Sequence, residues 1–543
     1  MKFSLVPSLL LTLVSGVSAT IYQNGQVRIT DYPDTRINPT SYSFSTFSPN
    51  SSELSYKGRW DSNHVSWWST PGLKFGFSGQ QVAITFGSLT TNGVLVGYRV
   101  DGQDWQLTNI TSNATHLLVS PSSPAINVTY PVNPSTFELR VTNWAYGVQI
   151  SAVHLGKGEK LFKIPDFSRS IEFIGDSLSS GYTNSLEGLS SFAYGTGAGL
   201  GNTEYSITAY PGICLYDQLC FGNARGLVHQ WFYTSDTSYR ATQIYGDKPV
   251  LWDFSKQKPA DLVIINIGTN DSNQANNVSS TDYVASYIKL IEGIHAVWPD
   301  AQVIIMSLWE GFYAYGNSYA QSQGFVSEIY GVYQYFNTQK YLSNPTLYNP
   351  RTNSTYSSHK ASAPFVSYFN TTGIMQHNDI GPAYHPTDVG HIKVASHLIQ
   401  YIKTKFNWPL YATGPEVFHD TLYSTILGLE GRDIKLELSK FDPIDTNGPN
   451  LVERRARLLI IFTSHSWYGK LSLSGRIIVP LIYNDDVKLN FYNIEGQFDH
   501  PMPSLIRRFS LPFHRLHASG KIIVPLMYNS DVQLNSPTPE LTV

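Results

Sequence analysis

The chain has 543 residues, enough for about two to four domains, and only 14% of them are charged, with a net charge of −3. This low and balanced charge argues against nucleic acid and against an anionic membrane surface as partners. Tyrosine and tryptophan are abundant, with 35 and 11 residues, which is typical of sugar-handling proteins but also of β-rich secreted proteins in general.

The first 19 residues are predicted to be a secretory signal peptide. Lys2 supplies the charged start, a short apolar run follows, and Val17-Ser18-Ala19 fits the small-residue cleavage rule. No later apolar run is long enough to span a bilayer, so we expect a secreted, extracellular protein. Seven sequons fit that route: Asn50, Asn109, Asn113, Asn127, Asn277, Asn353 and Asn370.

Residues 20–163 are predicted to form an all-β domain. Residues 81–86 and 94–100 alternate between apolar and polar side chains, and the second run ends at the tight-turn dipeptide Asp101-Gly102. Short strands without a helical period favour a β-sandwich of jelly-roll type. The tryptophans of this region, Trp60, Trp67 and Trp68, are either core residues or an exposed platform for a sugar.

The most informative stretch is residues 171–182. Three of its first four residues are apolar or aromatic, which predicts a short buried strand, and Gly175 permits a sharp turn directly after it. Ser177 then stands at the carboxyl end of the strand, where an open α/β sheet exposes its chemistry. A serine in this place is either a nucleophile or the cap of the following helix.

Two later stretches favour the nucleophile. Residues 262–271 read as a buried strand that runs into Asn270-Asp271, and His385-Pro386 precedes an amphipathic helix. Over residues 167–411 the chain resembles the SGNH (GDSL-type) hydrolases. The resemblance consists of three motifs in this order: a strand followed by Gly-Asp-Ser, a strand followed by Gly-x-Asn-Asp, and a late His-Pro. With a β-module directly before them, and with its Gly-Arg-Trp-Asp segment at residues 58–61, the chain also resembles carbohydrate esterase family 2.

The resemblance implies an α/β fold: an SGNH-type three-layer domain with a parallel sheet, preceded by the all-β jelly-roll domain. The sequence agrees, because an apolar helical face follows Asn277, a strand is predicted at residues 303–306, and Thr387 can cap another helix. The stretches 181–226 and 309–373 are expected to be long loops that build the substrate site.

The resemblance also assigns the chemistry. Ser177 would be the nucleophile and His385 the general base that later acts as the acid. The oxyanion donors would be the backbone N–H of Ser177, that of a block II glycine, and the side-chain amide of Asn270. Gly212 matches the block II glycine best, with Gly201 and Gly222 as nearby alternatives.

The histidine of the family is usually preceded, three residues earlier, by an aspartate. Pro382 stands there in this chain, so we expect a Ser–His dyad in which a main-chain carbonyl orients His385. Asp379 and Asp388 are the nearest acids, and each has a structural reading in a turn or a first helical turn. His391 competes for the role of base, but it lies inside the predicted helix.

Three residues are expected to support the site. Asp271 is predicted to hold its own turn and has no part in the mechanism. Cys214 and Cys220 are the only cysteines, and in an oxidising compartment they are expected to form a disulfide that stiffens the loop after Gly212. Two buried free thiols are the alternative.

Residues 416–543 form a tail to which no function can be assigned. Residues 474–490 recur at 519–535, which is too little for a repeat architecture. The tail is predicted to be either a small accessory β-region or a poorly ordered sequence that the hydrolase does not need.

The resemblance as a whole implies a secreted serine esterase, without metal or organic cofactor. It would remove O-acetyl groups from polysaccharide or oligosaccharide of the xylan or mannan type through an acyl-enzyme intermediate. A GDSL-type lipase or lysophospholipase is one alternative, and a non-catalytic sugar-binding protein is another.

Overall fold

A computed structural model of the chain describes residues 22–23, 26–27, 32–123, 126, 134–381, 384–409, 436–437, 458–461 and 506–509. It divides into two compact units, Met1–Thr421 and Leu422–Val543. The second unit contains strands β23 (Leu436–Glu437), β24 (Leu458–Ile461) and β25 (Ile506–Phe509), which pair antiparallel in that order. The predicted signal peptide, the sequon at Asn127 and both copies of the duplicated tail segment lie outside the described residues.

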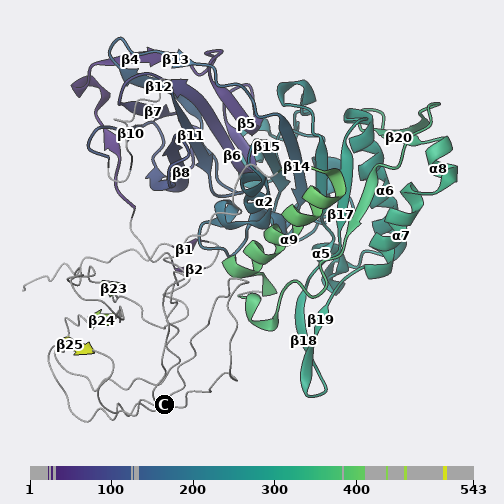
Figure 1. Cartoon of the computed structure of the whole chain (residues 1–543). Helices are drawn as coiled ribbons and strands as arrows, with labels where there is room; N and C mark the ends of the chain where they lie inside the picture. Colours follow the sequence, from purple (N-terminus) through teal and green to yellow (C-terminus); the bar gives the residue numbers. More distant parts are fainter. Residues whose placement is uncertain are drawn as a thin grey trace, which may run out of the picture. The chain divides into compact units, whose positions relative to one another are not determined.

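The first part of the chain is β-rich, as the sequence predicted (Figure 1). A five-stranded antiparallel sheet has the order β3-β10-β7-β12-β4, and β5, β13, β11, β8 and β9 form a second group around β6. The jelly-roll arrangement and the domain boundaries stay predictions. The strands are β1 (Tyr22–Gln23), β2 (Gln26–Val27), β3 (Arg36–Ile37), β4 (Phe44–Phe47), β5 (Ser55–Trp60), β6 (Ser66–Phe77), β7 (Val82–Phe86), β8 (Val94–Val100), β9 (Gln106–Ile110), β10 (Thr115–Val119), β11 (Ser135–Val141), β12 (Ile150–Gly156) and β13 (Leu161–Phe162).

One apolar cluster joins these two sheets. It takes Leu73 and Phe75 from β6 and Val82 and Ile84 from β7, all fully buried. The hairpin β8–β9 turns at Asp101-Gly102, where both residues have positive φ, 51° and 71°. Two successive positive φ angles are the geometry that an Asp-Gly hairpin turn favours.

The tryptophans of this region belong to the core. Trp60, Trp67 and Trp68 are all buried, so the sugar-platform reading of these three residues is wrong and the core reading holds. Trp67 and Trp68 pack in the same apolar cluster as Trp231 and Ile265, which come from the next part of the chain.

The second part of the chain alternates strands and helices. Its parallel sheet has the order β22-β17-β16-β14-β15. The strands are β14 (Arg169–Gly175), β15 (Thr203–Ala209), β16 (Leu262–Asn266), β17 (Gln302–Met306), β18 (Gly311–Tyr315), β19 (Ser318–Ser322), β20 (Thr346–Asn349), β21 (Ser354–Ser357) and β22 (Val366–Phe369). The helices are α1 (Ser177–Ser180), α2 (Phe192–Leu200), α3 (Leu227–Gln230), α4 (Tyr239–Tyr245), α5 (Thr269–Ser272), α6 (Ser280–Val297), α7 (Val326–Phe336), α8 (Gln339–Ser343) and α9 (Asp388–Phe406).

Both faces of this sheet are covered (Figure 1). Along β16, Val263 and Ile265 pack in a cluster with residues of α6 and α7, whereas Leu262 and Ile264 pack in a second cluster with residues of α2 and α9. Because successive side chains of a strand point to opposite faces, the continuous apolar run of β16 serves both clusters. Among the residues that the structure describes, no helix could cross a membrane.

The two stretches expected to be long loops contain regular elements. Residues 181–226 include α2 and β15, and residues 309–373 include two β-hairpins, α7 and α8. Strand β15 was missed because its sequence, Thr-Glu-Tyr-Ser-Ile-Thr-Ala, lacks the apolar run of the other parallel strands. One of its polar side chains, Glu204, is paired with Lys57 at 3.0 Å, which allows it to be buried.

The β-rich part and the parallel sheet are joined through β15 and β6. Ile207 pairs with Ser69 in an antiparallel bridge, so β6 and β15 belong to one eleven-stranded sheet. Nearby, the buried Arg59 of β5 points to Glu172 of β14, with 3.7 Å between Nη2 and Oε1. Its guanidinium lies 5.5–5.8 Å from the ring centres of Trp68, Trp231, Trp252 and Phe254.

Candidate active site

Ser177 is the first residue of α1, directly after β14. Gly175 must be a glycine, because a Cβ there would lie 2.1 Å from Ser179 Oγ and 2.6 Å from the carbonyl oxygen of Asn266. Asp176 caps the helix by accepting the N–H of Leu178 at 3.0 Å. The capping role that competed for Ser177 therefore falls to Asp176, and the serine hydroxyl is left for another partner.

That partner is His385, which lies 208 residues further along the chain. Its Nε2 is 2.7 Å from Ser177 Oγ, within hydrogen-bonding distance. The Tyr182 ring and the imidazole form a T-shaped pair with 4.9 Å between ring centres, and Trp144 and Tyr182 form another at 5.5 Å. Tyr182 is the last residue of the informative stretch 171–182, but nothing in the sequence indicated that it would contact the histidine.

The nearest acids have other partners. Asp379 Oδ2 accepts the backbone N–H of Gln376 and pairs with Lys393 Nζ, both at 2.6 Å. Asp388 accepts the backbone N–H of Ser185 at 3.1 Å and also its hydroxyl. Pro382 and Ala383, which occupy the places where the family pattern has its acid, lie outside the described residues.

His391, the competitor for the role of base, is held in the core. Its Nδ1 accepts the backbone N–H of Phe192 at 3.0 Å, and its ring stacks on that of Phe192. Burial lowers the pKa of His391 to about 3, so this imidazole stays neutral at ordinary pH. The structure brings His385, and not His391, to Ser177.

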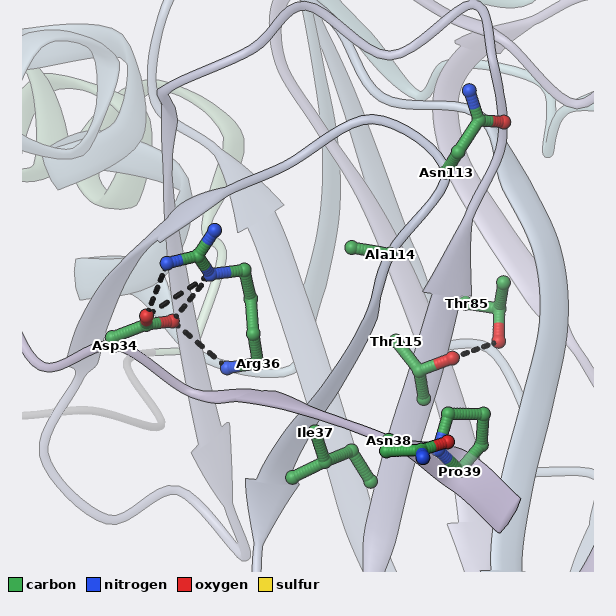
Figure 2. Close-up of a pocket in the computed structure, with 9 residues that line it drawn as sticks. All are labelled: Asp34, Arg36, Ile37, Asn38, Pro39, Thr85, Asn113, Ala114 and Thr115. Atoms are coloured by element: carbon green, nitrogen blue, oxygen red, sulfur yellow. Dashed lines mark hydrogen bonds and ion pairs between the residues drawn. The ribbon is translucent and has the colours of Figure 1, made fainter.

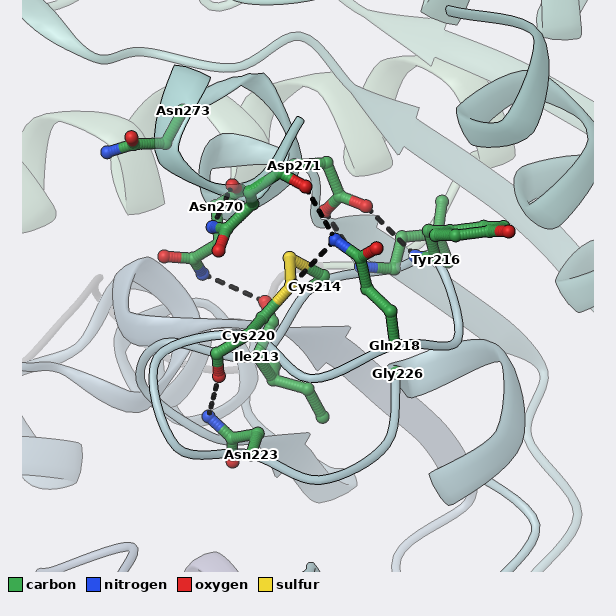
Figure 3. Close-up of a disulfide and its surroundings, with 12 residues drawn as sticks. Ile213, Cys214, Tyr216, Gln218, Cys220, Asn223, Gly226, Asn270, Asp271 and Asn273 are labelled. Carbon is green, nitrogen blue, oxygen red and sulfur yellow. Dashed lines mark hydrogen bonds between the residues drawn. A yellow bond between two sulfur atoms is a disulfide. The ribbon is translucent and has the colours of Figure 1, made fainter. Parts of the chain in front are cut away.

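Asn270 follows β16 in the short helix α5 (Figure 3). Its Nδ2 donates to the carbonyl oxygen of Ile213 at 2.8 Å. An amide nitrogen carries two N–H groups, so this bond orients the side chain and uses one of them. The carbonyl belongs to the residue after Gly212, whose φ of +77° strongly favours glycine. The bond therefore joins Asn270 to the residue next to Gly212, the other expected oxyanion residue.

Asp271 does more than hold its own turn, which is all that the sequence led us to expect. Its carboxylate accepts the backbone N–H of Leu215 at 2.7 Å and that of Tyr216 at 2.9 Å. The group is buried, and burial raises its pKa to about 6. In the same loop, Cys214 and Cys220 form a disulfide, with 5.8 Å between their Cα atoms (Figure 3). The loop is thus fixed by a covalent link and by a carboxylate from α5.

A cavity of about 720 Å³ lies elsewhere, in the β-rich part (Figure 2). Its walls include the ion pair Asp34–Arg36 and the sequon residue Asn113, and they contain neither Ser177 nor His385. Because Asn113 is an exposed residue of a turn, a glycan attached to it would stand at the rim of this cavity. Because neither Ser177 nor His385 lines it, this cavity is not part of the site formed by these two residues.

A hydroxyl at a strand end beside an imidazole from a distant loop is the arrangement of a serine hydrolase. Residues 173–392 match the model of the GDSL-like Lipase/Acylhydrolase family. This part of the chain is a GDSL-type acylhydrolase domain, and its relatives are carboxylic ester hydrolases.

Two curated proteins are similar in sequence. Cellulase/esterase CelE of Acetivibrio thermocellus is 32% identical over 170 residues, which cover 29% of this chain and 19% of that protein. An acetylxylan esterase / glucomannan deacetylase of Cellvibrio japonicus is 26% identical over 231 residues, which cover 36% of this chain and 61% of that protein. The chain therefore spans less than two thirds of either relative.

The fold is also found in a solved structure, a family two carbohydrate esterase from Clostridium thermocellum in complex with cellohexaose. The two chains share 22% identity and a TM-score of 0.50, over 65% of this chain and 99% of that one. At this identity, the likeness establishes the fold.

Proposed function

We propose that this chain is a carbohydrate O-acetyl esterase that uses Ser177 as its nucleophile and His385 as its base. The observation that carries the proposal is the 2.7 Å contact between His385 Nε2 and Ser177 Oγ. In the reaction, the imidazole takes the hydroxyl proton while Oγ attacks the acetyl carbonyl. The imidazolium then protonates the departing sugar oxygen, and water releases acetate from the acyl-enzyme by the same steps in reverse order.

The negative oxygen of each tetrahedral intermediate needs hydrogen-bond donors. The N–H of Ser177 lies at the start of α1, and the Gly212 N–H and the second Nδ2–H of Asn270 complete the proposed set. The bond between Asn270 and Ile213 supports this assignment, because it holds the amide beside the loop that carries Gly212. Donors fixed in advance need no reorganisation when the charge develops.

We further propose that the site is a dyad rather than a triad. The engagement of Asp379 with Lys393 and of Asp388 with Ser185 supports this, since each carboxylate already has polar partners away from the imidazole. A main-chain carbonyl would then fix the tautomer of His385, as the sequence led us to expect.

The relatives suggest the substrate. One is named an acetylxylan esterase / glucomannan deacetylase, and the solved neighbour was studied with a cello-oligosaccharide. We therefore propose acetylated plant polysaccharide, with secretion through the predicted signal at residues 1–19. The exposure of Asn50, Asn113 and Asn353 is compatible with glycosylation on that route.

A panel of esters tests the proposal. Initial rates should be measured on acetylated xylan, acetylated glucomannan, nitrophenyl acetate and nitrophenyl octanoate. We expect the acetyl esters to be cleaved well and the octanoate slowly, and Ser177→Ala to leave only trace activity on all of them. Ser180→Ala is the matched control, because this buried serine belongs to the same helix and is expected to remain active. A preference for octanoate would favour a lipase, and an active Ser177→Ala would exclude Ser177 as the nucleophile.

A further inference from the structure

The hairpin β18–β19 projects from the α/β part of the molecule (Figure 1). Three of its tyrosines are largely exposed: Tyr313 (52%), Tyr315 (69%) and Tyr319 (57%). A two-stranded hairpin with large exposed rings gains little stability from them, because they are not packed against a core. Their presence at this place calls for a functional explanation.

The two faces of the hairpin differ. On one face, Phe312 and Tyr319 meet the ring of His377, and Tyr319 stacks on it at 4.2 Å. This contact holds the hairpin to the segment just before the catalytic histidine. On the other face, Tyr313 and Tyr315 have their rings 6.4 Å apart, edge to face. Among the residues that the structure describes, these two rings contact no aromatic ring other than each other, and we call this the unpartnered face.

The unpartnered face begins beside Tyr384, the residue that precedes His385 in the chain. Side chains two residues apart in a strand share a face, so Gly311, Tyr313 and Tyr315 point the same way. A Cβ on Gly311 would lie 3.7 Å from Cδ1 of Tyr384, which is 75% exposed and directly precedes His385 in the chain. Tyr384 therefore lies at the base of the face that carries Tyr313 and Tyr315, and we describe these three tyrosines as a row along the hairpin.

The chemistry of the row suits a neutral glycan. Residues 311–322, Gly-Phe-Tyr-Ala-Tyr-Gly-Asn-Ser-Tyr-Ala-Gln-Ser, contain no charged side chain. A tyrosine offers an apolar ring face together with a hydroxyl at its edge. A pyranose has the matching pattern, with C–H groups on its face and hydroxyls around its rim. An aliphatic lid for a fatty acyl chain would instead be rich in leucine and isoleucine, and the hairpin has neither.

We propose that Tyr313, Tyr315 and Tyr384 bind the main chain of the polysaccharide beyond the sugar that carries the ester. We call this row the tyrosine ridge. The inference rests on the proposed function, and it goes further by naming the surface that distinguishes a polymer from a small ester. The occupant is a neutral, unbranched stretch of β-linked glycan, held by ring stacking and by hydroxyl contacts.

The test compares a polymer with a small ester. For the double variant Y313A/Y315A, we expect the ratio of kcat/KM on acetylated glucomannan to that on nitrophenyl acetate to fall about 5–100-fold, mainly through KM. Tyr356→Ala is the matched control, since Tyr356 (48% exposed) also lies in a β-hairpin, β20–β21, of the same part of the chain. We expect Tyr356→Ala to leave the ratio unchanged.

A second measurement does not depend on turnover. Ser177→Ala protein should be retarded in native gels that contain unacetylated glucomannan, and the additional Y313A/Y315A change should abolish the retardation. Equal retardation with and without the two tyrosines would overturn the tyrosine ridge, as would an unchanged ratio of the two kcat/KM values. A wild-type protein that binds through the ridge but cleaves none of the acetyl esters would instead contradict the proposed function.

Discussion

Asp271→Asn is the substitution that best separates positioning from folding in this site. The carboxylate holds two neighbouring N–H groups, those of Leu215 and Tyr216, at 2.7 and 2.9 Å. An asparagine keeps one acceptor oxygen but presents an NH2 group where the second oxygen was. One backbone N–H of the loop then loses its partner in a buried place, at a cost of about 1–3 kcal/mol.

The substitution also removes a cost. Burial raises the pKa of Asp271 from the usual 3.8 to about 6, which corresponds to about 3 kcal/mol spent on ionising this group in the folded protein. A carboxyl group whose pKa is higher in the folded state stabilises the fold below about pH 3.8, and this stabilisation is lost as the pH rises to about 6. At pH 8 the lost hydrogen bond and the removed charge therefore offset each other.

We therefore expect the Asp271→Asn variant to melt below the wild type at pH 4 and within a few degrees of it at pH 8. Its kcat on nitrophenyl acetate should nevertheless fall about 10–100-fold at pH 8, because the loop that follows Gly212 is less well fixed. Calorimetry from pH 4 to 8 and steady-state kinetics are the measurements, with the exposed Asp300→Asn as control. A kcat within twofold of wild type, or a difference in Tm that does not vary with pH, would refute the reasoning.

Two further predictions concern the same site. Asp379→Asn and Asp388→Asn should each lower kcat less than tenfold, because these acids bond to Lys393 and Ser185. If either variant stays folded but loses about 10⁴-fold in kcat, as is known for a triad aspartate, that residue would be the third member of a triad. The double change Cys214→Ala and Cys220→Ala should lower both Tm and kcat, since the disulfide and Asp271 fix one loop together. Melting curves and steady-state kinetics are the measurements, and an unaltered kcat would show that Asp271 alone is enough to hold the loop in place.

The contact between Ser177 and His385 could be predicted because parallel strands end at one edge of their sheet. A buried strand followed by Gly-Asp-Ser fixes where Ser177 lies, and Thr387 caps α9 so that His385 stands just before it. Motif order supplied the pairing of the two, and the 2.7 Å contact agrees with it. Such signals are local in sequence, so one chain is enough to find them.

What could not be predicted depends on contacts between distant segments. The bonds from Asp271 to Leu215 and Tyr216 join residues more than fifty positions apart, and the spacing gives no hint of them. The same holds for the ring of Tyr182 against His385. The tyrosine ridge is not indicated by the sequence for another reason. Residues 311–322 have a strand pattern without a core-facing side, and the sequence predicts them as part of a long loop.

The bridge between Ile207 and Ser69 has a consequence for how such an enzyme can evolve. A domain that recombines freely between proteins has a sheet whose edge strands need no partner from another domain. Here β15 would be the edge strand of the parallel sheet, but it pairs with β6 of the β-rich part. A fragment that started at residue 167 would expose β15 as an edge strand, which could then pair with a strand of another copy. It would also leave the buried Glu172 without Arg59. Recombination that replaced the β-rich part would have to supply a matching strand and a buried arginine. The two halves are therefore expected to be inherited as a pair.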